Sequence, residues 1–194
     1  RALGACAVLA VIAGATWTLW PRPPVWPWPT RPAVTALDIG QGDAILLRGA
    51  DGSAVLVDAG PPGEPPAVVD AQHRQGVRRL DALVITHGDA DHVGGATAVL
   101  DRLVVGVVVH PPEPAAGWGD LMATALDAAE GDGVATAAVR TGDHITAGPW
   151  SLDVLGPRGP LAAGAPANDG SVVLHADAAG FSALLTGDAE SHAL

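Results

Sequence analysis

Four side chains that could bind metal ions are crowded into one short stretch of the sequence: His87, Asp89, Asp91 and His92. Imidazole nitrogens and carboxylate oxygens are ligands that suit Zn²⁺ or Mn²⁺. A loop lets alternate side chains of such a stretch converge on two neighbouring ions, and its glycines permit the tight backbone that this needs. The spacing therefore predicts a metal site, and the alternative interpretation is a solvated acidic loop.

The elements that must position this stretch can be read from hydrophobic runs and their spacing. A buried strand is predicted directly before it and a helix directly after it. Hairpins are predicted at both ends of the domain, with strand–helix alternation between them, which indicates mixed sheets with helices outside, an α/β or α+β sandwich. The predicted strands are 34–39, 44–48, 53–58, 83–86, 104–109, 134–140, 150–155, 171–175 and 181–185, and the predicted helices are 67–77, 94–103 and 120–130.

The N-terminal segment has a different character. Residues 2–20 carry no charge, and a helix of about 20 apolar residues crosses a bilayer, so 1–20 is predicted to be a transmembrane helix. Trp17 and Trp20 stand at its end, where indole rings favour the membrane interface. A signal peptide and a buried core helix are the alternatives. The Pro- and Trp-rich stretch 21–32 is predicted to be a stiff linker, followed by one domain over 33–194.

Composition excludes several classes of protein. The 194 residues include one cysteine, which rules out an internal disulfide framework and a cysteine-rich zinc cluster. All ten basic residues are arginine, and the net charge is −11. Residues 1–32 carry +3 and residues 33–194 carry −14, so the domain lacks the basic surface of a non-specific nucleic-acid binder.

The spacing His87-x-Asp89-x-Asp91-His92-x-Gly94-Gly95 resembles the metal-binding motif of the metallo-β-lactamase superfamily. Most of that family has His where this sequence has Asp89, and Asp at this position resembles the C-terminal hydrolase domain of ComEC-type competence proteins, which are bacterial DNA-uptake channels. Further segments resemble the same branch, in the same order: 37–46, 55–61, 168–174 and 184–190. The resemblance implies an αββα metallo-β-lactamase-like sandwich preceded by one transmembrane helix.

The resemblance also implies roles for single residues. His87 and Asp89 would bind the first of two divalent ions (Zn or Mn), and Asp91 and His92 the second. Asp188 would bridge both ions, although taken alone, after Gly187, it is typical of a turn. Asp91 and Asp188 are the predicted catalytic residues, because either could orient the attacking water.

Two more residues are singled out by the resemblance. Asp58 is expected to orient the metal loop through hydrogen bonds rather than to bind an ion. Asn168 stands near the position where many members of the family have a further histidine, and it either points at the site or caps a turn. The family continues past the Asp188 motif to a later His-rich strand, so we expect the domain to be incomplete at its C-terminus, one ligand short, and weak in metal binding or in folding.

The function that the resemblance implies is a metal-dependent hydrolase domain of a membrane protein for DNA internalisation. DNA would be the substrate, cleaved at phosphodiester bonds during uptake, and other competence proteins would be partners. The domain is expected at the cell membrane on its extracytoplasmic side. The alternatives are another metallo-β-lactamase-fold hydrolase, acting on a lactam, thioester or phosphate ester, and a catalytically silent domain of a channel. The net charge of −14 disfavours tight binding of DNA by this domain alone.

Overall fold

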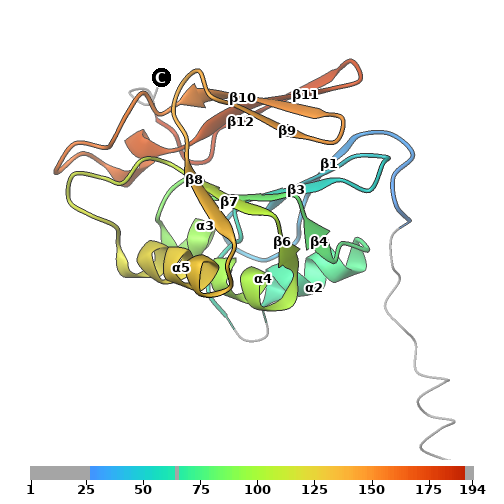
Figure 1. Cartoon of the computed structure of the whole chain (residues 1–194), viewed down its shortest axis with the longest axis horizontal. Helices are drawn as coiled ribbons and strands as arrows, with labels where there is room; N and C mark the ends of the chain where they lie inside the picture. The colour runs from blue at the N-terminus through green and yellow to red at the C-terminus, as the bar shows by residue number, and fades with distance from the viewer. Residues whose placement is uncertain (1–26, 64–65, 191–194) are drawn as a thin grey trace, which may run out of the picture.

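Two β-sheets face each other, and helices cover the outer face of one of them (Figure 1). The computed structural model describes residues 27–63 and 66–190. The larger sheet has the strand order β1-β2-β3-β5-β7-β8. Its first three strands pair antiparallel and the others parallel. The bounds are β1 Ala33–Ala36, β2 Ile45–Arg48, β3 Ala54–Val57, β5 Ala82–Val84, β7 Val107–His110 and β8 Ala135–Ala138.

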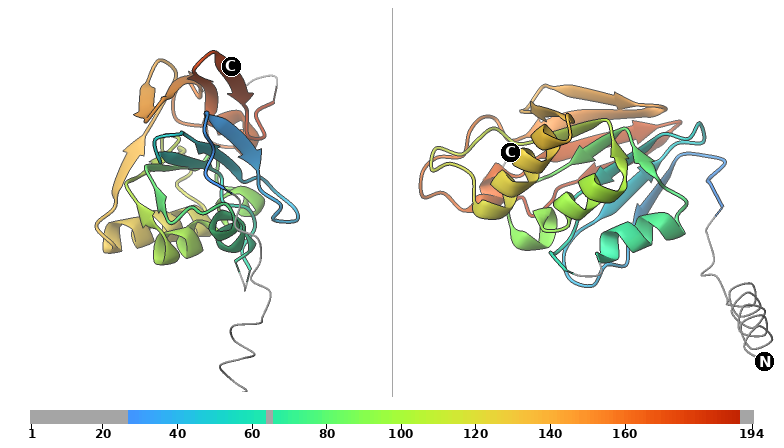
Figure 2. Two further views of the ribbon diagram at one scale, coloured as in Figure 1. Left: turned by 90° about the vertical axis from the view of Figure 1, so that its right-hand side faces the viewer. Right: turned by 60° about the horizontal axis from the view of Figure 1, so that its bottom comes forward.

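The second sheet is antiparallel, in the order β12-β11-β10-β9. Its strands are β9 His144–Ala147, β10 Trp150–Gly156, β11 Val173–Ala178 and β12 Phe181–Leu185, and β4 Arg79–Leu80 pairs with β6 Val104–Val105 in a separate short ladder. The helices are α2 Ala67–Arg74, α3 Ala90–Val93, α4 Ala96–Arg102 and α5 Asp120–Gly131, with a 3₁₀ turn, η1, at Ala167–Gly170. The helices lie together on one face of the larger sheet, below it in Figure 1 and in front of it in the right-hand view of Figure 2.

Burial along the strands explains this layering. All four residues of β3 are buried, as expected for a strand covered on both faces. In β10 buried and more exposed residues alternate, so this strand buries only one face. One core fills the space between helices and larger sheet, and a second core, around the fully buried Trp150, fills the space between the sheets. Within 27–63 and 66–190, no helix covers the outer face of the second sheet.

The sandwich predicted from the sequence is confirmed as a mixed α/β fold, and most predicted elements are present with shifted ends. The predicted strand 104–109 is wrong as a single element. It breaks at Gly106, where an added Cβ would lie 2.6 Å from the carbonyl oxygen of Asp81, and β6 turns away to pair with β4. Strand β9 and the short helix α3 were not predicted. The predicted transmembrane helix at 1–20 lies outside the described residues. Within the described parts of the chain, we find no helix with the length and apolar character needed to cross a membrane.

The end of the predicted linker contacts the domain. The indole Nε1 of Trp28 donates a hydrogen bond to the Gly49 carbonyl oxygen at 2.7 Å, and the Arg48 guanidinium lies 5.6 Å from the centre of the Trp28 ring. Trp28 also packs against the core under the larger sheet. This tryptophan is therefore bound to the fold at the turn between β2 and β3.

Candidate metal centre

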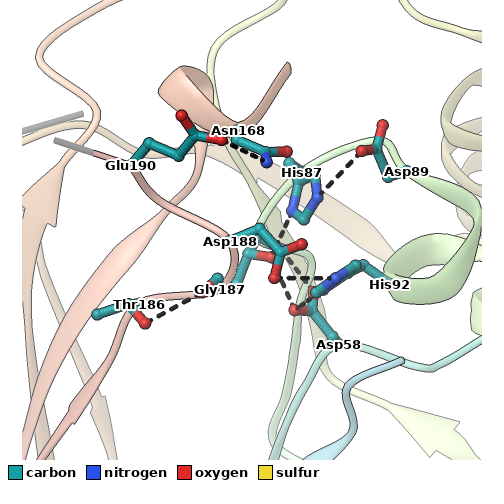
Figure 3. A network of polar contacts seen from close by, with 10 residues as sticks. Asp58, His87, Asp89, His92, Asn168, Thr186, Gly187, Asp188 and Glu190 are labelled. Atoms are coloured by element: carbon teal, nitrogen blue, oxygen red, sulfur yellow. Dashed lines mark hydrogen bonds and ion pairs between the residues drawn. The ribbon is translucent and has the colours of Figure 1, made fainter. Parts of the chain in front are cut away.

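The carboxyl ends of the parallel strands bring the predicted site together at one edge of the larger sheet. Asp58 follows β3 and Thr86 and His87 follow β5, while His92 lies on α3 directly beyond. Because parallel strands point the same way, residues that follow their ends meet at one edge, which is where open α/β sheets bind ligands. Asp188 reaches the same place from the second sheet, just after β12 (Figure 3).

Three side chains form a group that could hold a metal ion: His87, His92 and Asp188. One donor atom from each lies within 4.8 Å of the others. His92 Nε2 is 3.3 Å from Asp188 Oδ1, and the two imidazole rings lie 4.2 Å apart between centroids. Both histidines are 2% exposed, whereas the Asp188 side chain is 47% exposed. The group is therefore anchored inside the protein and open to solvent on its carboxylate side.

A glycine allows the aspartate to approach. Gly187 has φ +49°, and a Cβ on it would lie 2.7 Å from Thr86 Oγ1. A side chain at this position would strain the backbone and push the loop after β12 away from the end of β5. Val172 N also donates to the Thr86 carbonyl oxygen at 2.8 Å, which ties the segment before β11 to the same point. The second half of the chain is thus fixed against the metal loop.

Asp58 determines which nitrogen of each imidazole carries the proton. The Thr86 backbone N–H and hydroxyl both donate to this carboxylate, each at 2.7 Å, and His92 Nδ1 donates to it at 2.9 Å. Since the Thr86 hydroxyl proton is directed to Asp58, its oxygen accepts from His87 Nδ1, 3.0 Å away. In its neutral form each histidine therefore keeps its proton on Nδ1 and leaves Nε2 as the free nitrogen, which is the form that binds a metal.

Burial and charge act differently on the two imidazoles. Burial lowers the pKa of His87, and the positive charge on neighbouring His92 lowers it further. Burial also lowers the pKa of His92, but the hydrogen bond and charge of Asp58, with the charges of Asp188 and Asp91, outweigh it and raise this pKa to about 9. Without an ion, protonated His92 supplies the positive charge between the carboxylates of Asp58 and Asp188.

The residues present fit a divalent cation. His87 Nε2 is buried and has no hydrogen-bond partner within the protein, although an unpaired buried polar atom is costly. His87 also belongs to the group with His92 and Asp188, whose two imidazoles and one carboxylate are a donor set that suits Zn²⁺ and similar ions. A cation bound to these three donors would satisfy His87 Nε2 and replace the proton on His92.

The structure places the other predicted ligands less closely. The Asp89 side chain is 52% exposed, and its Oδ2 lies 3.6 Å from His87 Nε2. Asp91 lies on α3 outside the three-residue group, although its charge acts on His92. The assignment of one ion to His87 and Asp89, and of another to Asp91 and His92, stays a prediction, as do the catalytic roles of Asp91 and Asp188. In the structure the His87 and His92 rings lie side by side, with 4.2 Å between their centroids.

Asn168 lies in η1, beside the same site (Figure 3). Its Nδ2 donates to Glu190 Oε1 at 3.4 Å. The structure thus brings this amide near His87 while pairing it with a carboxylate after β12. Sequence reasoning did not identify Thr86 as part of the site, although a threonine directly before the first histidine was the available signal.

A family model described as the metallo-beta-lactamase superfamily matches residues 37–192. The chain belongs to the metallo-β-lactamase superfamily. This fold binds divalent metals, and in this member the candidate donors are His87, His92 and Asp188.

Two curated relatives of this metallo-β-lactamase domain are a ComE operon protein and a competence protein. ComE operon protein 3 of Bacillus subtilis (strain 168) is 32% identical over 181 residues, which covers 81% of this chain and 22% of that protein. Competence protein ComA of Neisseria gonorrhoeae is 40% identical over 82 residues, covering 42% of this chain and 12% of that protein. The chain spans less than a quarter of the length of either relative.

Solved structures show the same fold. A metallo-β-lactamase from Cronobacter sakazakii superposes with a TM-score of 0.56 at 20% identity, covering 87% of this chain and 65% of that one. The diiron β-hydroxylase CmlA of Streptomyces venezuelae gives a TM-score of 0.54 at 19% identity, covering 84% of this chain and 31% of that one. At these identities the likeness establishes the metallo-β-lactamase fold alone.

Proposed function

We propose that this metallo-β-lactamase domain is a metal-dependent phosphodiesterase that cleaves DNA during uptake through a membrane. The observation that carries the proposal is the His87, His92 and Asp188 group in a chain whose curated relatives are competence proteins. DNA offers the phosphodiester bond on which such a hydrolase could act during internalisation. We place the domain at the cell membrane on the extracytoplasmic side, with other competence proteins as partners.

The proposed reaction is hydrolysis. A water oxygen attacks phosphorus, the bond to one bridging oxygen breaks, and the products are a phosphate monoester and a free hydroxyl. When bound, divalent ions make water a competent nucleophile near neutral pH and offset the charge that develops on the phosphoryl oxygens. His87 and His92, with Asp188, would hold the ions. Asp188 is half-exposed and stands at the mouth of the site, so its carboxylate is placed to orient the water and accept its proton.

The strongly acidic surface makes the ions more important for this substrate. Residues 33–194 carry a net charge of −14, and binding to phosphates normally depends on lysine and arginine. Divalent ions held by His87, His92 and Asp188 would offset part of this negative charge beside the scissile phosphate. We therefore expect hydrolysis to require loaded metal for substrate binding as well as for chemistry.

The test compares substrates and variants of the purified, metal-loaded chain. Wild type is expected to cleave a fluorescent single-stranded oligonucleotide and to leave a chromogenic cephalosporin intact. His87→Ala is expected to reduce DNA cleavage at least about 100-fold, because one ligand and the order of the site are lost. His144→Ala removes a histidine paired with Asp153 on the outer face of the second sheet and is the matched control.

Three results would contradict the proposal. Cleavage of the cephalosporin alone would indicate a lactam hydrolase. DNA cleavage that persists in His87→Ala would place the activity elsewhere or in a contaminant. A folded, metal-loaded chain that hydrolyses neither substrate would support a catalytically silent domain.

A further inference from the structure

A cavity of about 290 Å³ opens beside the candidate metal centre. His87 and Asp89 are among the residues that line it. The loop after β7 provides one wall, including Trp118, and the loop after β10 provides the other, including Leu161. The two loops are joined where Ala115 N donates to the Leu161 carbonyl oxygen at 2.9 Å. The cavity is therefore continuous with the site where hydrolysis is proposed.

The walls of this cavity are mostly apolar. Proline, glycine, alanine, leucine and tryptophan make up nearly all of the described lining residues, and these include no arginine. Asp89 is the one acidic residue among them. Such walls neither attract a phosphate group nor satisfy a sugar hydroxyl, and they suit a flat group with apolar faces.

Trp118 gives this cavity an aromatic surface that is already held in place. The side chain is half-buried and packs against the core beneath the larger sheet. The His110 ring lies edge-on to it, with 5.7 Å between centroids and an angle of 81° between planes. Both loops that line the cavity contain prolines, which restrict their backbones. A ligand that stacks on Trp118 would meet a surface that loses little freedom on binding.

We propose that this cavity binds one nucleobase of a single-stranded DNA substrate by stacking on Trp118, next to the phosphodiester at the metal centre. The inference rests on the proposed function. The volume is at the small end of ligand pockets, which suits one unpaired base rather than a base pair. A base inside a duplex is stacked and paired, so it reaches such a cavity only when it is unpaired or turned out.

Stacking also resolves the difficulty with charge. An acidic domain cannot bind DNA mainly through cationic contacts with phosphates, as many nucleic-acid-binding proteins do. Base–aromatic stacking provides binding that needs no basic surface and accepts any base, because every base has a π-face. In this arrangement the phosphate would lie at the metal centre formed by His87, His92 and Asp188, and the adjacent base would stack on Trp118.

The experiment measures equilibrium binding to the metal-loaded chain by calorimetry, with two probes that share a phosphate. Deoxyadenosine 5′-monophosphate has the base, and 2-deoxyribose 5-phosphate lacks it. We expect the nucleotide to bind at least about fivefold more tightly. Equal binding of the two probes would overturn the proposal, and this comparison needs no variant.

Variants at Trp118 then test whether its indole ring causes the tighter binding of the nucleotide. Trp118→Phe is expected to keep most of the preference for the nucleotide, whereas Trp118→Leu and Trp118→Ala lose it, with thermal melting to verify that each is folded. Phe181→Leu removes a half-exposed aromatic ring at the far end of β12 and is the matched control. If Trp118→Leu binds the nucleotide as well as Trp118→Phe does, the cavity selects apolar bulk and the proposal fails.

Oligonucleotide cleavage separates this inference from the proposed function. We expect KM to rise when the nucleotide beside the scissile bond is abasic, with a smaller change in kcat. If DNA is cleaved but the two phosphate probes bind equally, the base subsite fails and the phosphodiesterase stands. If no DNA is cleaved while the nucleotide preference persists and depends on Trp118, the base subsite stands and the phosphodiesterase fails.

Discussion

Asp58 connects the two histidines of the metal centre although it is not part of the donor group itself. Its backbone has φ +60°, in the left-handed region that aspartate tolerates better than most residues do. The side chain is 1% exposed and accepts three hydrogen bonds, two of them from Thr86 and one from His92. A carboxylate can accept all three because it carries no proton.

Replacing Asp58 by asparagine tests this role. Asp58→Asn puts an NH₂ group where one carboxylate oxygen accepted hydrogen bonds. The amide therefore cannot accept from all the donors of Thr86 and His92. We expect Zn²⁺ or Mn²⁺ affinity to fall roughly 10- to 100-fold, measured by titration against a competing chelator. Asp153→Asn, on the exposed face of the second sheet, is expected to leave affinity unchanged. Equal affinity in Asp58→Asn and wild type would show that the rings are positioned without this carboxylate.

The raised pKa of His92 predicts how metal binding depends on pH. Its folded value of about 9 lies above the ordinary 6.5, so protonated His92 stabilises the metal-free fold fully below about pH 6.5, and this stabilisation is lost as pH rises through 9. An ion must displace that proton. Metal affinity is therefore expected to increase up to about pH 9 and then level off.

Two titrations check this dependence. Melting of the metal-free chain should show stability declining between about pH 6.5 and 9, and chelator competition over the same range should show affinity increasing. In Asp58→Asn the increase in affinity should end at a lower pH, because the hydrogen bond and charge that raise this pKa are reduced. Affinity that is flat from pH 6 to 9 would contradict the assignment of His92 as a ligand.

At the scale of elements, the contact of α3 and α4 with the loop after β3 holds His92 in place. Ala59 N donates to the His92 carbonyl oxygen at 2.7 Å, and Gly95 N donates to the Gly60 carbonyl oxygen at 3.0 Å. A Cβ on Gly95 would collide with the Ala59 carbonyl oxygen. The close approach of these segments therefore depends on glycine between the two helices.

Gly95→Ala is expected to separate α4 from the loop after β3. The overpacking should cost about 1–3 kcal/mol of unfolding free energy and weaken metal binding, because His92 moves with α3. Chemical denaturation and chelator competition measure the two effects. Gly131→Ala is the control at the end of α5, where nothing lies within 4 Å of the added Cβ, and it should be neutral or slightly stabilising. A Gly95→Ala chain as stable as wild type would contradict the packing argument.

Sequence pattern could predict the elements with strong periodicity and the location of the metal loop. It could not predict α3, because a helix over Ala90–Val93 is too short to show a period. Strand β9 was missed because only one of its four residues is buried, which leaves no apolar run to recognise. Trp118 joins the site through the packing of two loops distant in sequence, and no local motif signals that contact.

At the scale of the whole molecule, the donor group spans both sheets. His87 follows a strand of the larger sheet and His92 lies on α3 beside it, while Asp188 follows the last strand of the second sheet. An ion bound to all three would link the layers in addition to the core between them. Its binding free energy would then contribute to the stability of the whole fold.

Metal removal is expected to lower the melting temperature. An ion at about 100 times its Kd stabilises the fold by about 2.7 kcal/mol, which a chelator would remove. Calorimetry with and without chelator measures this difference. Asp188→Asn should lose most of the metal-dependent stabilisation, while Asp177→Asn, an exposed substitution on β11, should retain it. Identical melting of loaded and chelated protein would mean that no ion joins the two layers.

The hydrogen bond between Trp28 and Gly49 fixes where the polypeptide enters the domain. The turn after β2 lies at the edge of the larger sheet opposite the carboxyl ends of β3 and β5, where Asp58 and His87 stand (Figure 1). A support attached at Trp28 would therefore lie at the end of the domain away from the candidate metal centre, which would face outward. Immobilisation through the N-terminal side would leave the metal centre accessible from solution.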